Sequence, residues 1–308
     1  MGYFSDQEMN RRLANLRHAM DNQSVEAVLI TSVHNTLYYS NFWMIPWGRE
    51  QGLVIPRENE PAAIAPHIEY DRPAKMVGDG SNFRDIRIYT DNASAIDGWV
   101  GLARQVLLDR GITSGRIGIE EDNVSITMHK ALCTALPDLE FVEMGYAMMC
   151  EQMLKSDEEI ALIRAGAEIC DLGAQAFVDA VHDGVTEVQV ARASVTAMEE
   201  EICRRFPGHE CDGTFCWAQS GPENTKVAHG LNTDRQMHSG DLLSLNVFPM
   251  ILGYYHLLER SLVFEPISAE VQKYFEIQVE VHHAGIAALK PGVRSEEHTS
   301  ELQSRAYL

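Results

Sequence analysis

The sequence predicts an α/β domain followed by an α+β domain. Its 308 residues are enough for two domains of ordinary size. In the first half, short apolar runs of strand length alternate with amphipathic helices, whereas the second half opens with long helical patterns. Two apolar runs then flank a turn-prone centre at residues 249–253, which predicts a strand hairpin within residues 227–265.

The first domain is expected over residues 1–150. Helices alternating with short strands are typical of an α/β layer, and a last strand near Phe141 closes the pattern. The first helix, residues 5–22, places Met9, Leu13, Leu16 and Met20 on one face. The other expected elements are strands at 27–30, 52–55, 62–65 and 116–119, and helices at 97–108 and 126–136.

The second domain is expected over residues 151–294. Ser156 with Glu159 and Thr186 with Gln189 form two capping-box patterns, and each precedes an apolar stripe of helical spacing. A third helix is expected from Ser268 to about Leu289, before a proline and a glycine. Two helices, a hairpin and a third helix make an α+β domain.

Composition excludes several classes of function. The 45 acidic and 25 basic side chains leave a net charge of −20, which repels nucleic acid. The apolar runs are far shorter than the roughly 20 residues that cross a bilayer, and the polar N-terminus is unlike a signal peptide. The six scattered cysteines form no CxxC pair, so we expect free thiols in the cytoplasm rather than a zinc site.

Two side chains near the hairpin are candidates for proton-transfer chemistry. His229 stands in the sequence VAHG, and an imidazole titrates near neutral pH, as a general acid or base must. The ordinary alternative, a loop histidine with local hydrogen bonds, is the commoner case. Glu259 is expected at an inward position between Leu258 and Leu262, where a carboxylate needs a partner or a site.

Two further observations concern charge pairing. A surface pair of Glu259 with Arg260 is the alternative for that carboxylate, but adjacent strand residues point to opposite faces. In the first domain, Arg49 follows Trp47 and Gly48, and its guanidinium could clamp a carboxylate through two hydrogen bonds. If this tripeptide stood alone, Arg49 would be interpreted as an ordinary surface residue.

Longer stretches resemble a known family. They are TSVHNTLYYSNF with the following WGR, MLKSDEEIALIRAGAEICDLG, AQSGPENTKVAHG and GDLLSLNVFPMILGYYHLLERSLVF. Over about Ser5 to Arg294, the chain resembles the creatinase family, whose pita-bread fold is shared with methionine aminopeptidases and prolidases. The resemblance implies a creatinase-type N-terminal domain followed by a pita-bread domain.

The same hairpin supplies metal ligands in the metallopeptidase relatives. Two aspartates there lie seven residues before and four residues after the glycine of a Gly-Tyr pair, which corresponds here to Gly253. The matching positions hold Asn246 and Leu257. Leucine has no lone pair to donate, and a neutral amide is a poor ligand for a hard dication. We therefore expect no metal and no other cofactor.

The resemblance implies an amidinohydrolase that converts creatine, a linear amidine, to sarcosine and urea. His229 would activate water, Glu259 would bind the guanidinium, Arg49 would hold the carboxylate and Trp47 would line the pocket. Family members are homodimers in which the last two residues reach the partner's site. Hydrolysis of another small zwitterion such as ectoine, and a non-catalytic partner-binding homologue, remain open, and a metalloaminopeptidase ranks last.

The last residues, 295–308, are polar and do not continue the apolar pattern. We interpret them as a non-homologous tail, resembling a translated sequencing adapter, on a truncated domain. The family's later histidine, arginine and glutamate would lie beyond Arg294. The 308-residue chain is therefore expected to be inactive.

Overall fold

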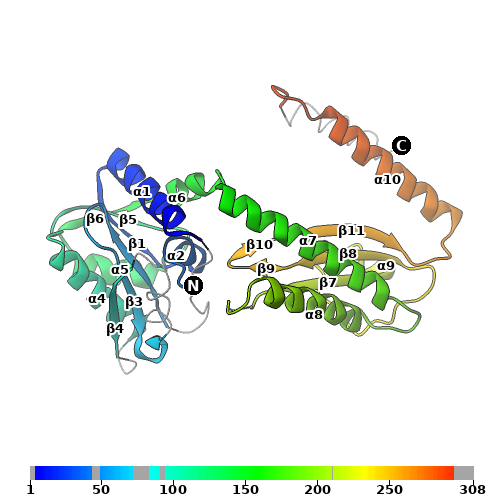
Figure 1. Ribbon diagram of the computed structural model, residues 1–308, viewed down its shortest axis with the longest axis horizontal. Helices are drawn as coiled ribbons and strands as arrows, with labels where there is room; N and C mark the ends of the chain where they lie inside the picture. The colour runs from blue at the N-terminus through cyan, green and yellow to red at the C-terminus, as the bar shows by residue number, and fades with distance from the viewer. Residues whose placement is uncertain (1–3, 44–48, 72–82, 91–93, 210, 295–308) are drawn as a thin grey trace. The chain divides into compact units, whose positions relative to one another are not determined.

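A computed structural model describes residues 4–43, 49–71, 83–90, 94–209 and 211–294. The chain divides into two compact units, Met1–Ile163 and Arg164–Leu308, which are described separately (Figure 1). Within the described ranges, no helix is both long enough and apolar enough to cross a membrane.

Unit 1 is built on a six-stranded mixed sheet in the order β4-β3-β2-β1-β5-β6. Strand β1 pairs antiparallel with β2 and parallel with β5, and β2 pairs antiparallel with β3. The outer pairs β3–β4 and β5–β6 are parallel. The strands are β1 (Val25–Ile30), β2 (Gly52–Pro56), β3 (Ala62–Pro66), β4 (Asp85–Tyr89), β5 (Gly115–Ile119) and β6 (Leu139–Glu143).

Helices cover both faces of this sheet, so unit 1 is the expected α/β layer. Trp99, which is fully buried, anchors a core of α4 and α5 side chains on one face. Leu16 and Met148 belong to a second core formed by α1, α2 and α6 on the other face. The helices are α1 (Asp6–Gln23), α2 (Val33–Ser40), α4 (Ala95–Asp109), α5 (Ile126–Ala135) and α6 (Gly145–Gln152), with a short 3₁₀ turn η1 (His67–Glu69).

Unit 2 has a three-stranded antiparallel sheet in the order β11-β8-β7. The expected hairpin is β8 with β11, and its tip is a two-stranded ribbon of β9 and β10 around Leu252 and Gly253. The strands are β7 (Phe215–Ser220), β8 (Leu242–Phe248), β9 (Met250–Ile251), β10 (Tyr254–Tyr255) and β11 (Leu258–Val263). The helices are α7 (Asp157–Ala180), α8 (Glu187–Arg205), α9 (Gly221–Asn224) and α10 (Ala269–Ala288).

Helices α7 and α8 run along the sheet of unit 2 (Figure 1). Alternate strand residues face them and are buried, among them Cys216, Leu245 and Val247. The hydroxyl of Ser194 on α8 donates to the carbonyl of Gly173 on α7 at 2.8 Å, so the two helices pack against each other. The opposite face of the sheet carries the polar and aromatic residues considered below.

Both capping boxes form as the sequence predicts. The backbone N–H of Ser156 donates to the Glu159 carboxylate at 2.7 Å, and the Glu159 N–H donates back to the Ser156 hydroxyl at 3.2 Å. Thr186 and Gln189 make the equivalent reciprocal pair at the start of α8. The expected helices and strands all lie within a few residues of their predicted positions.

Several elements were missed by the sequence-based prediction. β4 reads DIRIY, a five-residue segment with no continuous apolar run, and only Tyr89 is buried. β7 was overlooked because FCWAQS lacks the β-branched residues that mark most strands. The short elements η1, α6 and α9 have no long apolar period for a pattern to detect.

Gly166 of α7 predicts a large difference between two similar substitutions. A Cβ at this position would lie 2.1 Å from Cδ2 and 2.2 Å from Nε2 of His256, a ring that is 8% exposed. We expect Gly166→Ala to lower the free energy of unfolding of unit 2 by about 1–3 kcal/mol, because the packed ring must move. Chemical denaturation, monitored by hydrogen exchange of the α7 and β8 amides, would measure this loss of stability.

Gly101→Ala in α4 is the matched control. Apart from its chain neighbours and the backbone of its own helix, no described atom lies within 4 Å of the Cβ that this change would add, so only the intrinsic helix preference should act. Gly101→Ala should therefore stabilise unit 1 by up to about 1 kcal/mol. Equal effects at the two glycines would contradict the packing of His256 on α7.

Candidate functional site

The open face of the unit 2 sheet brings together residues from all three strands. Asn246 on β8 pairs directly with Glu259 on β11 and with Trp217 on β7. Directly opposed residues of antiparallel strands point to the same face. Trp217, Asn246 and Glu259 therefore form one row across the sheet.

His229 joins this row through its ring. It lies on the exposed loop between α9 and β8, and its imidazole meets the Trp217 ring edge-on with 5.7 Å between centroids. The structure thus places His229 beside one end of the row, at Trp217, and Glu259 at the other end, on β11.

The loop that carries His229 is held against β7 by two amide side chains. Gln219 donates from Nε2 to the carbonyls of Asn224 and Val227, at 3.1 Å and 2.5 Å. Asn232 accepts from the Ala218 N–H at 2.6 Å and donates to the Cys216 carbonyl at 2.8 Å. Asn232 therefore satisfies backbone groups on the outer edge of the sheet.

Aromatic side chains surround Trp217 on the same face. Phe215 stacks on Phe248 with centroids 4.4 Å apart, and Trp217 lies 5.0 Å from Phe248. The ring of Tyr255 is 6.0 Å from Phe215. Such a wall beside a carboxylate suits a planar cation, because aromatic faces attract cations and the carboxylate supplies the charge.

The two positions that would bind metal in a metallopeptidase do not fit a metal. The Asn246 amide already donates from Nδ2 to the Trp217 carbonyl at 3.1 Å and to the Ser244 hydroxyl at 3.1 Å. Leu257, which is 58% exposed, offers only carbon atoms. Among the residues that the structure describes, no three histidine, cysteine, aspartate or glutamate side chains gather as metal ligands would.

The position of Glu259 corrects one expectation. Its side chain is exposed rather than inward, and it lies on β11, an edge strand of the three-stranded sheet. The Arg260 guanidinium donates at 2.6 Å to the backbone carbonyl of Glu259, and the two side chains lie on opposite faces of the strand. The carboxylate of Glu259 therefore belongs to the open face, with Asn246.

The other two candidates, Trp47 and Arg49, belong to unit 1. Trp47 lies outside the described residues. Arg49 is exposed and belongs to a unit whose placement relative to unit 2 is not determined. Their expected contribution to the site across a dimer interface stays a prediction.

Several residues of this face were not found by sequence reasoning. Trp217, Gln219 and Asn232 are important here because of what they contact, and their local sequence carries no motif for it. Trp217 lies on β7, a strand that the sequence-based prediction did not include. A recognised strand at 215–220 would have revealed it, since the alternation places Trp217 opposite to the buried Cys216 and Ala218.

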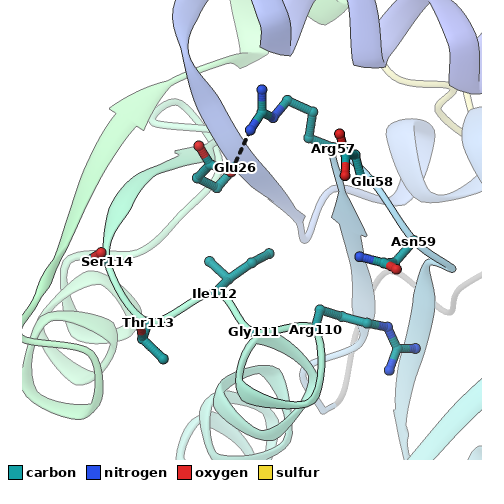
Figure 2. A pocket seen from close by; sticks show the side chains of 9 residues that line it. All are labelled: Glu26, Arg57, Glu58, Asn59, Arg110, Gly111, Ile112, Thr113 and Ser114. Carbon is teal, nitrogen blue, oxygen red and sulfur yellow. Dashed lines mark hydrogen bonds and ion pairs between the residues drawn. The ribbon is translucent and has the colours of Figure 1, made fainter.

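A hollow in unit 1 is lined partly by charged side chains. It encloses about 180 Å³ near the start of β1 and β5, and Figure 2 shows Arg57 and Arg110 at its rim. Arg57 pairs with Glu26 at 2.8 Å, and Arg110 pairs with Asp85 at 2.7 Å. Both cations are therefore already neutralised by carboxylates, and we do not assign a ligand to this pocket.

Comparison with known proteins identifies both halves of the chain. Residues 12–149 match the creatinase/prolidase N-terminal domain, and residues 161–306 match metallopeptidase family M24. Creatinase from Bacillus sp. (strain B-0618) is 38% identical over 299 residues, covering 97% of this chain and 71% of that protein. The chain belongs to the creatinase/prolidase family.

Solved structures of the family share its two-domain pita-bread fold. A prolidase from Thermococcus sibiricus superimposes with a TM-score of 0.79 at 19% identity, covering 97% of this chain and 77% of that one. The Xaa-Pro dipeptidase from Bacillus anthracis has a TM-score of 0.75 at 19% identity, with the same coverage. At this identity the likeness concerns the fold, so the choice between peptide and amidine chemistry depends on the residues of the site.

Proposed function

We propose that this member of the family hydrolyses the C–N bond of a small zwitterion that carries a guanidinium group, with creatine as the substrate. The row of Trp217, Asn246 and Glu259, with His229 against Trp217, is the observation that supports the proposal most directly. The 38% identity to a creatinase over most of the chain supports it independently.

The roles of the residues follow from their chemistry. The exposed carboxylate of Glu259 would bind the guanidinium through charge-assisted hydrogen bonds, beside the aromatic wall. His229 would take a proton from water as the oxygen adds to the guanidinium carbon, and would deliver it to the leaving nitrogen. Creatine and one water then give sarcosine and urea. Arg49 would hold the carboxylate of the substrate.

Metal-dependent peptide hydrolysis is the alternative within the family. It is disfavoured by the donor set at the ligand positions, because Asn246 is already used as a hydrogen-bond donor and Leu257 has no donor atom. Binding without catalysis is the alternative from another class. The carboxylate and the imidazole on one exposed face are more than a pure binding surface requires.

The purified protein should release urea from creatine at the same rate with and without a chelator. Glu259→Gln should raise KM for creatine by about 10-fold or more, because a charge-assisted contact of roughly 1.5–3 kcal/mol is lost. A panel of creatine, ectoine and an Xaa-Pro dipeptide identifies the substrate. Dipeptide cleavage that a chelator abolishes would overturn the proposal.

A further inference from the structure

Glu187, the first residue of α8, is a buried carboxylate to which the proposed reaction assigns no role. Its side chain is completely shielded from solvent. Burying an anion costs free energy unless hydrogen bonds compensate for the lost water. The groups that supply those hydrogen bonds therefore indicate what the residue does.

Five donors converge on this carboxylate. Oε1 accepts from the Ser220 N–H at 2.8 Å, the Ser220 hydroxyl at 2.7 Å and the Asn224 amide at 2.9 Å. Oε2 accepts from the Thr233 N–H at 2.9 Å and the Thr233 hydroxyl at 2.6 Å. Burial alone would raise the pKa of Glu187, but these hydrogen bonds outweigh it and lower the pKa, so the group is anionic at neutral pH.

The donors flank the segment that carries His229. Ser220 and Asn224 lie on its N-terminal side, and Thr233 lies on its C-terminal side. Oε1 of Glu187 binds the N-terminal side and Oε2 binds the C-terminal side, so a single buried carboxylate closes the loop at its base. Between these ties, Gln219 and Asn232 fasten the segment to β7, which sets the imidazole of His229 5.7 Å from the Trp217 ring.

Helix capping does not account for Glu187. An acidic residue in the first turn of a helix is favourable in general. At α8, however, the capping hydrogen bonds are made by the side chains of Thr186 and Gln189. The partners of the Glu187 carboxylate lie instead at positions 220–233, more than thirty residues away in the sequence.

We propose that Glu187 is a positioning residue for His229, because its buried carboxylate ties together the two ends of the loop that presents the imidazole. The catalytic part of this inference rests on the proposed function. The structural part, that Glu187 restrains residues 221–232, does not rest on the proposed function.

Glu187→Gln tests the inference with almost no change in size. The amide has only one acceptor oxygen, so its NH₂ group must face either the donors at Ser220 and Asn224 or those at Thr233. Backbone N–H groups cannot turn to accept a hydrogen bond, so at least one of them loses its partner. Loss of a hydrogen bond to a charged group should raise amide exchange in residues 224–233 by about 10- to 100-fold.

Glu120→Gln is the matched control in unit 1. Glu120 is 1% exposed and accepts hydrogen bonds from the N–H groups of Thr31 and Ser32, at 2.7 Å and 2.9 Å, and from the Asn35 amide at 2.6 Å. This variant also weakens a buried carboxylate cluster, but it should leave exchange in residues 224–233 unchanged. If Glu187→Gln does not fold, Thr233→Val removes one donor and should raise exchange there by about 5- to 10-fold.

Kinetics of the purified protein separate positioning from general stability. Glu187→Gln should lower kcat for urea release by about 10- to 100-fold with KM changed less than about twofold, because His229 is displaced while the binding residues remain. Unchanged exchange in residues 224–233, or equal kinetic effects of the Glu187 and Glu120 variants, would overturn the inference. If the parent releases no urea, the proposed function fails, and the exchange data still decide the role of Glu187.

Discussion

His229→Ala should lower kcat for urea release from creatine by about 10²- to 10⁴-fold, the usual contribution of a positioned general acid or base. The imidazole is exposed beside the row of Trp217, Asn246 and Glu259, and His229 is the one histidine among these four residues. Because Glu259 remains in place, KM should change little. Steady-state kinetics of the purified protein measure both constants.

His238→Ala is the matched control for this prediction. His238 is an exposed histidine before β8, and its ring contacts Asp183 at 3.2 Å rather than the candidate site. Its substitution should leave kcat within about twofold of the parent, as expected for surface changes. His229→Asn, which keeps a hydrogen-bonding side chain without a titrating imidazole, should be as inactive as His229→Ala. Activity retained in both His229 variants would rule out proton transfer by this residue.

Arg12→Ala should lower the free energy of unfolding of unit 1 by about 3–5 kcal/mol, the usual result of removing one partner of a buried ion pair. The Arg12 guanidinium is 1% exposed, donates to Glu8 at 2.7 Å and to the Tyr38 carbonyl at 2.9 Å, and lies 4.0 Å from the centre of the Phe4 ring. The substitution removes these contacts together. Hydrogen exchange of the β1 and β5 amides, which open on global unfolding of the unit, would report the loss.

Arg11→Ala is the control on the same helix. Arg11 also pairs with Glu8 at 2.7 Å, but its side chain is 34% exposed, so solvent weakens the pair. Its loss should cost about 1 kcal/mol or less. Equal losses from the two variants would contradict the dominant role of burial.

The pairing of Glu8 with Arg11 and Arg12 makes the stability of unit 1 depend on pH. Burial alone would raise the pKa of Glu8, but the hydrogen bonds from Arg11 and Arg12 outweigh it and lower the pKa below 4.5. A carboxylate with a lowered folded-state pKa stabilises the fold above its unfolded pKa, and this contribution is lost as pH falls through the folded value. The difference in stability between the parent and Arg12→Ala should therefore shrink as pH drops below about 4.5.

Local patterns predicted the regular elements well because each depends on nearby residues. The capping boxes at Ser156 and Thr186 form, and the turn at Leu252 and Gly253 closes the hairpin. β4 and β7 escaped prediction because their strand conformation depends on pairing with distant partners, β3 and β8. A strand that gains its stability from its neighbours need not carry a pattern of its own.

The candidate site was predicted only in part. His229 and Glu259 were found from their residue types and from the family resemblance, and the roles assigned to them remain predictions. Trp217, Asn232 and Glu187 act through contacts with residues far away in the sequence, and no spacing rule connects them. Glu187 in particular has the sequence signature of an ordinary residue in the first turn of a helix.

By itself, the sequence determined the division into an α/β part and an α+β part, the caps of the long helices, and the lack of metal-ligand chemistry at Asn246 and Leu257. These follow from residue types and short-range spacing. Only the tertiary structure decided that Glu259 faces the open side of the sheet, that Trp217 and Asn246 connect it to His229, and that Glu187 ties the loop. Strand register and buried hydrogen bonds join residues tens of positions apart, so they are settled only when the chain folds.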